Sequence, residues 1–305
     1  MIETRELTRT FGGVVAVDRV TTTVADRGLV GFLGPNGAGK TTTMRMLTGF
    51  LPATSGDAIV AGFDVFDQPL EVRARVGYLP EHPPLYPELT VGEYLSFVAE
   101  IRGVPRGVRL ARVGEVMARV GLTGWERRRL ATLSKGYRQR VGLAQAIVHD
   151  PRLVILDEPT AGLDPAQVVS VRRLIRELAA DRTVLVSTHV LAEIEVLCDR
   201  ILLLHRGRLV GDGTVDALAD TVGRGPWVEL AVDAPDGDLS AAIARLPEVA
   251  AVERIEARRY RIRGGAEVEP ALARAAAGWG WGVRTIVRHR ASLEAVFLAL
   301  IGEES

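Results

Sequence analysis

Short apolar runs and amphipathic stretches alternate along the first two thirds of the chain. Six apolar runs have the length of buried strands: 28–33, 58–61, 76–79, 153–156, 183–186 and 201–204. Helices are predicted over 91–119, with a break near Gly103 to Pro105, over 136–149, and over 165–180, where apolar residues recur at helical spacing. Strands that alternate with helices predict an α/β fold with a mainly parallel sheet.

The pattern changes after Asp220. The residues TVGRGP, 221–226, are typical of a glycine-rich linker. Beyond them the expected order is strand 227–232, helix 239–246, strand 249–256, strand 259–263, helix 268–278 and strand 282–288, with a last helix over 292–301. This βαββαβ order is the ferredoxin-like pattern of a small α+β domain. We therefore predict two domains, 1–220 and 226–305.

Composition narrows the class of protein. The 305 residues carry 38 basic and 38 acidic side chains, which argues against a nucleic-acid binder that works through bulk charge. The single cysteine, Cys198, excludes an intramolecular disulfide and fits a reducing compartment. No apolar run approaches the roughly 20 residues that span a bilayer, and the first residues lack the apolar core of a signal peptide. We expect a soluble cytosolic chain with no nucleic-acid partner.

A glycine-rich loop follows the apolar run 28–33. Its sequence GPNGAGKT, 34–41, matches the pattern G-x-x-x-x-G-K-[ST], and TMRMLTGF, 43–50, is predicted as the helix behind it. The backbone N–H groups of such a loop wrap a phosphate chain, Lys40 adds a charge at the β- and γ-phosphates, and the Thr41 hydroxyl is suited to Mg²⁺. We expect these residues to bind a nucleotide: Gly34, Pro35, Asn36, Gly37, Ala38, Gly39, Lys40, Thr41 and Thr42.

Two carboxylates, Asp157 and Glu158, end the apolar run 153–156. Asp157 is well placed to hold Mg²⁺ through its water shell. Glu158 would point differently and could polarise the attacking water as a general base. An isolated acidic pair at a strand end is usually a solvated turn, but phosphoryl transfer needs both a metal holder and a group that orients water, so the phosphate loop favours the functional interpretation.

Further motifs resemble those of ABC ATPases. LSKGYRQR, 133–140, resembles their signature sequence, AGLD, 161–164, resembles their D-loop and includes Asp164, and STH, 187–189, resembles their switch and includes His189. Phe11 resembles the aromatic residue that stacks on adenine. Order and spacing agree, and the resemblance covers roughly residues 1–220.

The resemblance implies a P-loop NTPase fold of the ABC type, with an N-terminal antiparallel β subdomain and a helical subdomain. It also implies that two ATP-binding subunits, in a homodimer or a heterodimer, hold ATP and Mg²⁺ between them head to tail. The signature of one copy (Ser134, Lys135, Gly136 and Tyr137) would close in trans on the nucleotide held by the other. Lys40, Glu158 and His189 are the expected catalytic residues, and His189 would contact the γ-phosphate and the attacking water. An integral membrane permease is the implied partner, which would hold the chain at the cytoplasmic face of the membrane.

Two positions depart from the usual family pattern. In the signature LSKGY the serine and the second glycine are kept, while Lys135 and Tyr137 change their surroundings. After the run 76–79, Glu81 stands where the family usually has glutamine. An ionised glutamate accepts hydrogen bonds but cannot donate them. We expect Glu81 to keep a metal-sensing role, so the predicted metal holders are Thr41, Glu81 and Asp157.

The finer assignment is to export. YLPE at 78–81, the variant signature and SLEAVF at 292–297 resemble the ATPases of bacterial exporters, including those of multidrug, antibiotic and gliding-motility systems. One alternative is an importer ATPase whose C-terminal domain senses a ligand. Another is an ABC ATPase outside transport, a class that usually has two cassettes in one chain or a long coiled coil between these motifs. This chain has one cassette, with about 90 residues and no heptads between Lys40 and Ser134. These features favour transport.

Overall fold

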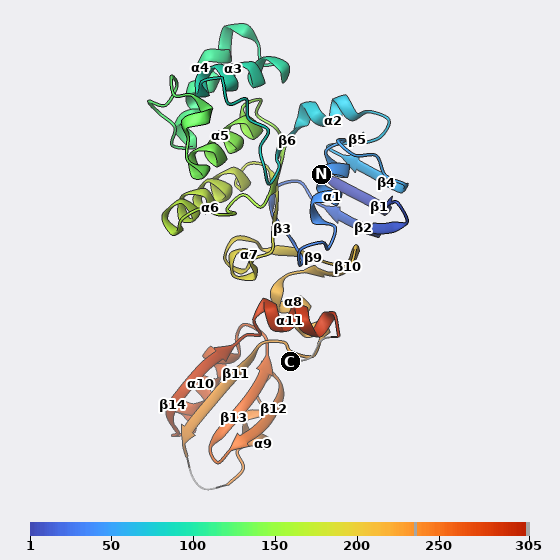
Figure 1. Ribbon diagram of the computed structural model, residues 1–305. Helices are drawn as coiled ribbons and strands as arrows, with labels where there is room; N and C mark the ends of the chain where they lie inside the picture. The colour runs from blue at the N-terminus through green and yellow to red at the C-terminus, as the bar shows by residue number, and fades with distance from the viewer. Residues whose placement is uncertain (235–236, 303–305) are drawn as a thin grey trace. The chain divides into compact units, whose positions relative to one another are not determined.

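The computed structural model describes residues 1–234 and 237–302, and it divides into two compact units (Figure 1). The units are Met1–Asp212 and Gly213–Ser305. This division falls earlier than the expected boundary at Asp220, because helix α8 (Val215–Thr221) packs against helix α11 (Leu293–Leu300) of the second unit. The residues before Asp220 therefore contribute a helix to the C-terminal unit.

A six-stranded sheet organises the first unit. Its order is β10-β9-β3-β8-β7-β6, made of β3 (Gly28–Leu33), β6 (Val76–Leu79), β7 (Leu153–Asp157), β8 (Thr183–Thr188), β9 (Arg200–His205) and β10 (Arg208–Gly213). The five strands from β9 to β6 pair in parallel. Their carboxyl ends therefore meet at one edge, which is where α/β proteins bind ligands. The apolar runs predicted as strands all form strands.

An antiparallel sheet packs beside the parallel one. Its order is β2-β1-β4-β5, made of β1 (Ile2–Phe11), β2 (Val14–Val24), β4 (Ser55–Val60) and β5 (Phe63–Asp64). Helix α1 (Lys40–Leu47) contacts β2 and β4 of this sheet and β7 of the parallel sheet. One hydrophobic core, including Leu7, Phe32 and Met44, joins the three elements. This shared core holds the start of α1 at the end of β3.

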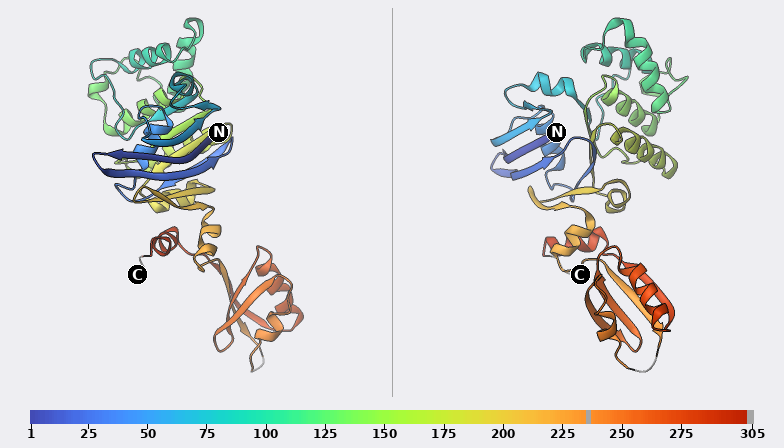
Figure 2. Two further views of the ribbon diagram at one scale, coloured as in Figure 1. Left: turned by 90° about the vertical axis from the view of Figure 1, so that its right-hand side faces the viewer. Right: turned by 180° about the vertical axis from the view of Figure 1, so that it is seen from behind.

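Helices cover the face of the parallel sheet opposite the antiparallel sheet (Figure 2). They are α5 (Lys135–Ile147), α6 (Pro165–Ala179) and the shorter α7 (Leu191–Leu197). Helices α3 (Val91–Ile101) and α4 (Arg106–Arg119) pack against α5, and the short α2 (Pro69–Arg75) contacts β5 and β6. The predicted break within 91–119 is confirmed, because α3 ends before Gly103, whose φ is +78°. Thr90 and Glu93 form a capping box at the start of α3.

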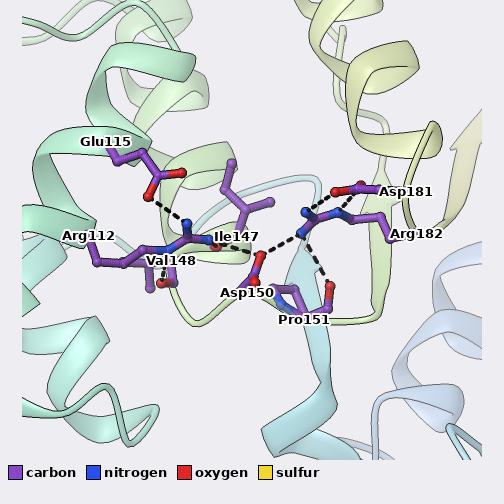
Figure 3. A network of polar contacts seen from close by, with 8 residues as sticks. All are labelled: Arg112, Glu115, Ile147, Val148, Asp150, Pro151, Asp181 and Arg182. Atoms are coloured by element: carbon purple, nitrogen blue, oxygen red, sulfur yellow. Dashed lines mark hydrogen bonds and ion pairs between the residues drawn. The ribbon is translucent and has the colours of Figure 1, made fainter. Parts of the chain in front are cut away.

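A polar network ties this helical region to the sheet (Figure 3). Arg112 of α4 donates to the carbonyl oxygen of Ile147 at 3.1 Å and pairs with Asp150 at 3.1 Å. Arg182, just before β8, pairs with the same Asp150 oxygen at 3.2 Å and donates to the carbonyl oxygen of Pro151 at 3.3 Å. The carboxylate of Asp150 thus bridges two arginines from different parts of the unit, which fixes α4 and α5 against the start of β8.

The second unit has the ferredoxin-like topology predicted from its sequence. Strands β11 (Trp227–Asp233), β12 (Val249–Glu256), β13 (Arg259–Gly264) and β14 (Gly282–His289) pair antiparallel in the order β12-β13-β11-β14. The helices between them are α9 (Ser240–Ile243) and α10 (Val268–Gly278). Helix α9 is shorter than the predicted helix 239–246. Among the helices of the described residues, none combines the length and the apolar character needed to cross a membrane.

Gly77 offers a test of the packing between β6 and α5. A Cβ at Gly77 would lie 2.0 Å from the carbonyl oxygen of Ala146, so Gly77→Ala should lower the free energy of unfolding by about 1–3 kcal/mol. The control is Gly114→Ala in α4, where no atom lies within 4 Å of the added Cβ. It should raise that free energy by about 1 kcal/mol, because alanine favours helix. Urea unfolding measures both, and a Gly77→Ala protein as stable as the wild type would contradict the close contact.

His149 gives the stability of the fold a defined pH dependence. It follows α5, its Nε2 lies 3.3 Å from the carbonyl oxygen of Val76, and burial, with a smaller contribution from the Arg102 charge, lowers its pKa from 6.5 to about 4. As pH falls the unfolded chain binds the proton first, so stability that is present above pH 6.5 is lost toward pH 4, at about 1.4 kcal/mol per pH unit.

The substitution His149→Gln isolates this effect, because glutamine keeps a donor for Val76 and does not titrate. Urea unfolding of both proteins between pH 7 and pH 4, a range taken from the two ends of that titration, should show a shallower decline for the variant. Equal pH dependence of the two proteins would contradict the assigned pKa.

Candidate nucleotide site

A cavity of about 570 Å³ lies at the carboxyl edge of the parallel sheet. It is lined by Phe11, Ala16, Asn36, Gly37, Gly39, Lys40, Thr41, Thr42, Glu81, Glu158 and His189. Every lining residue except Ala16 was predicted from the sequence as a nucleotide-binding, metal-holding or catalytic residue. Segments far apart in the chain, from β1 to the end of β8, therefore contribute to one cavity.

Close backbone contacts shape the phosphate loop. Gly37 and Gly39 have φ of +79° and +103°, which side chains rarely adopt. A Cβ at Gly39 would lie 2.4 Å from the carbonyl oxygen of Ala16, and one at Gly34 would lie 2.3 Å from that of Leu204. The loop is thus held between β2 and the end of β9. Three of its residues, Gly34, Pro35 and Ala38, do not line the cavity.

Lys40 is a buried cation at the start of α1. Its side chain is 7% exposed, and Nζ donates to the carbonyl oxygens of Gly34 at 2.7 Å and Pro35 at 3.1 Å. Burial lowers the pKa of Lys40, and the charges of Glu158, Asp157 and Glu81 act in the opposite direction. A charged amine this far from water gains from a bound anion, and the cavity beside it is open to one.

The acidic pair at the end of β7 has two different environments. Asp157 is fully buried, one of its oxygens accepts a hydrogen bond from Ser187 Oγ, and among the described residues Oδ2 has no partner. Glu158 borders the cavity, and its Oε1 lies 2.9 Å from His189 Nδ1. Glu158 also has φ of +50°, a conformation that a non-glycine residue keeps only when its surroundings enforce it.

The residues proposed for a metal fit an oxygen-preferring cation. Thr41 and Glu81 line the cavity that Lys40 and Glu158 also line. The unpartnered Oδ2 of buried Asp157 needs a donor or a cation's water shell to satisfy it. Hydroxyl and carboxylate oxygens are the ligands Mg²⁺ takes from proteins, together with phosphates and water. The donor set therefore suits Mg²⁺.

Phe11 stands at the edge of the cavity. It is the last residue of β1 and is 43% exposed. The guanidinium carbon of Arg9 lies 4.5 Å from the centre of its ring. Arg9 thus covers one face of the ring in a cation–π contact. An exposed aromatic ring beside a phosphate loop is suited to stack on a planar base.

The signature residues do not line this cavity within the described chain. Ser134 caps α5 and its Oγ accepts a hydrogen bond from the N–H of Tyr137 at 3.5 Å. The Tyr137 ring stacks on Trp125 with centroids 3.9 Å apart. A Cβ at Gly136 would lie 2.1 Å from Gln167 Oε1, so a side chain there would displace Gln167.

Lys135 and Asp164 are also outside the cavity. Lys135 Nζ lies 2.1 Å from where a Cβ on Gly162 would be, so this lysine covers the turn that precedes Asp164. The Asp164 side chain accepts from the N–H of Gln167 at 3.0 Å and caps α6. Both the signature and the D-loop are therefore ordered around helix starts, where backbone N–H groups favour anions.

Comparisons with known proteins agree with these motifs. The profile of the ABC transporter family matches residues 17–161. The bacitracin transport ATP-binding protein BcrA of Bacillus licheniformis is 40% identical over 220 residues, which are 72% of this chain and 71% of that protein. This chain belongs to the ABC transporter ATP-binding family.

Other ABC proteins extend the similarity. The linearmycin resistance ATP-binding protein LnrL of Bacillus subtilis is 31% identical over 250 residues, 82% of this chain and 80% of LnrL. This span is longer than the first unit, so it includes part of the C-terminal unit. A solved ATP-binding subunit of an ABC transporter is 32% identical, covers 73% of this chain with 94% of its own length, and superposes with a TM-score of 0.68.

Gly39 tests the geometry of this ABC phosphate loop. Gly39→Ala should weaken ATP binding at least tenfold, because its φ of +103° and the 2.4 Å approach to Ala16 exclude a Cβ without moving the loop. Isothermal titration calorimetry with ATP and Mg²⁺ measures the affinity. Gly107→Ala in α4, where the added Cβ meets nothing within 4 Å, is the control. Unchanged affinity of Gly39→Ala would contradict the role of this backbone.

Proposed function

We propose that this protein binds ATP with Mg²⁺, hydrolyses it as a dimer, and drives export through a separate membrane permease. The observation that carries the proposal is the convergence of Lys40, Glu158 and His189 on one cavity, with Asp157 buried at the end of β7, directly before Glu158. A cation for phosphates, a carboxylate for a metal and a carboxylate for water are the groups that phosphoryl transfer requires.

Each residue has a role in this proposal. Lys40 leaves the carbonyl oxygens of Gly34 and Pro35 to bind the β- and γ-phosphates, and Phe11 stacks on adenine. Thr41, Asp157 and Glu81 hold Mg²⁺, which when bound neutralises charge on the phosphates.

Glu158 and His189 together activate the attacking water in this proposal. Glu158 accepts a proton from the attacking water. His189, 2.9 Å from that carboxylate, orients Glu158 and contacts the γ-phosphate. The short distance between the two side chains supports this division of roles, because a general base must be held in one position as the water attacks.

The dimer completes the site. Ser134 and the backbone of Gly136 lie outside the cavity of their own chain, and in the proposal they bind the γ-phosphate of a second subunit from the start of α5. Asp164 of the D-loop would lie at the same interface. ATP then holds two subunits together and hydrolysis releases them, which transmits work to the permease.

Export is supported by the relatives. BcrA is a bacitracin transport protein and LnrL a linearmycin resistance protein, and both names describe handling of an antibiotic. From these relatives we propose that this chain acts at the cytoplasmic face of the membrane, on a polytopic membrane partner. Copurification of the tagged chain with a polytopic membrane protein tests this extension, and copurification with a substrate-binding protein of an import system would argue against it.

Glu158→Gln tests the catalytic role. Loss of the base should lower ATP turnover by about 10²–10⁴-fold, while ATP binding is retained because the phosphate loop is unchanged. Steady-state phosphate release measures turnover, calorimetry measures binding, and light scattering should detect an ATP-dependent dimer of the variant.

The matched control is Glu177→Gln on α6, whose side chain is 56% exposed, and it should leave turnover unchanged. Full turnover in Glu158→Gln would remove this residue from the role of base. A strictly monomeric Glu158→Gln protein at saturating ATP, also in the presence of its permease, would contradict the proposed dimer.

A further inference from the structure

The segment that follows Glu158 is held by a second buried contact. Thr160 is 7% exposed, and its Oγ1 donates a 2.6 Å hydrogen bond to Glu193 Oε2. Glu193 lies on α7, is 8% exposed, and its other oxygen pairs with Arg172 of α6 at 3.2 Å. A short hydrogen bond to a carboxylate is among the stronger contacts of a protein interior.

Two more hydrogen bonds hold the same segment, residues 158–160. The side-chain amide of Gln139, on the signature helix α5, donates to the carbonyl oxygen of Pro159 at 3.1 Å. The backbone N–H of Glu158 donates to the carbonyl oxygen of Ser187 at 3.1 Å. Elements α5, α7 and β8 therefore all hold the three residues 158–160.

The contacts form two parallel links between the same two segments. Glu158 and Thr160 lie two residues apart after β7, and His189 and Glu193 lie four residues apart after β8. One link is the Glu158–His189 contact at 2.9 Å, and the other is the Thr160–Glu193 hydrogen bond. Because the second link is buried, it limits how far the segment that bears His189 can move from the segment that bears Glu158.

We infer that Glu193 is a positioning residue, which acts through Thr160 to fix the carboxylate of Glu158 relative to the ring of His189. The inference rests on the proposed function, in which that pair handles the attacking water. Glu158 is in a conformation that its surroundings must enforce, with φ of +50°. The Thr160–Glu193 link, supported by Arg172, supplies part of that constraint, and a shift of about 1 Å in a catalytic group can cost 10²-fold in rate.

Three variants of the full chain separate this role from a general contribution to stability. Thr160→Val removes the hydroxyl at nearly constant volume, Thr160→Ser keeps it, and Glu193→Gln weakens the acceptor and its pairing with Arg172. The control is Thr4→Val in β1, because Thr4 is 3% exposed and also makes a side-chain hydrogen bond, to Thr22, but lies in the antiparallel sheet. Phosphate release gives kcat and KM, and calorimetry gives the affinity for ATP with Mg²⁺.

Thr160→Val should lower kcat by about ten- to a hundredfold, with KM and ATP affinity within about twofold of wild type. Thr160→Ser should restore at least half of the wild-type kcat, and Thr4→Val should leave kcat unchanged even where its melting temperature falls. Glu193→Gln should lower kcat by about tenfold, and it remains informative where Thr160→Val does not fold. A wild-type kcat in Glu193→Gln, or equal losses in the valine and serine variants, overturns the inference.

The background of Glu158→Gln distinguishes this inference from the proposed function. When the base is already absent, Thr160→Val should change the residual rate by less than about twofold, because the two residues act through one path. A further full loss in the double variant would overturn the inference and leave the role of Glu158 intact. Full turnover in the single variant Glu158→Gln would instead remove Glu158 from the role of base in the proposed function.

Discussion

The parallel pairing of β3, β8, β7 and β6 is the constraint on which the rest of the site depends. Parallel register brings Leu33, Leu79, Asp157 and Thr188 to one edge of the sheet, although they are separated by long stretches of sequence. The phosphate loop, Glu81, Glu158 and His189 each follow one of these strands. A one-residue change of register in any of these strands would turn the site residue that follows the strand to the other face of the sheet. That residue would then leave the cavity.

The burial of charged side chains in the site costs free energy unless those charges find partners. Lys40 and Asp157 are 7% and 0% exposed, and charges removed from water gain only if they are paired or bind a ligand. Short contacts meet part of that need, through the carbonyl oxygens of the loop for Lys40 and through Ser187 for Asp157. What remains unsatisfied, such as Oδ2 of Asp157, is what the proposed Mg²⁺ and its water shell would satisfy.

Most strands and long helices could be predicted because their apolar periodicity and their breakers are local properties. The elements 28–33, 76–79, 249–256 and 268–278 have the predicted bounds. Helices α2 and α7 were missed because seven residues, about two turns, give too little helical periodicity to recognise. Strand β10 was missed because its residues RLVGDG contain no apolar run of strand length. The predicted helix 239–246 was too long, since α9 ends at Ile243 and turns complete the connection.

The sequence by itself identified nearly all the residues that line the cavity, because the phosphate loop, Glu158 and His189 lie in short contiguous motifs. The tertiary structure decided which distant groups support them. The oxygen of Ala16 that excludes a side chain at Gly39, and the carboxylate of Glu193 that holds Thr160, belong to no motif. Their partners are brought close only by sheet register and helix packing, and no local pattern encodes a contact between segments that meet only when the chain folds.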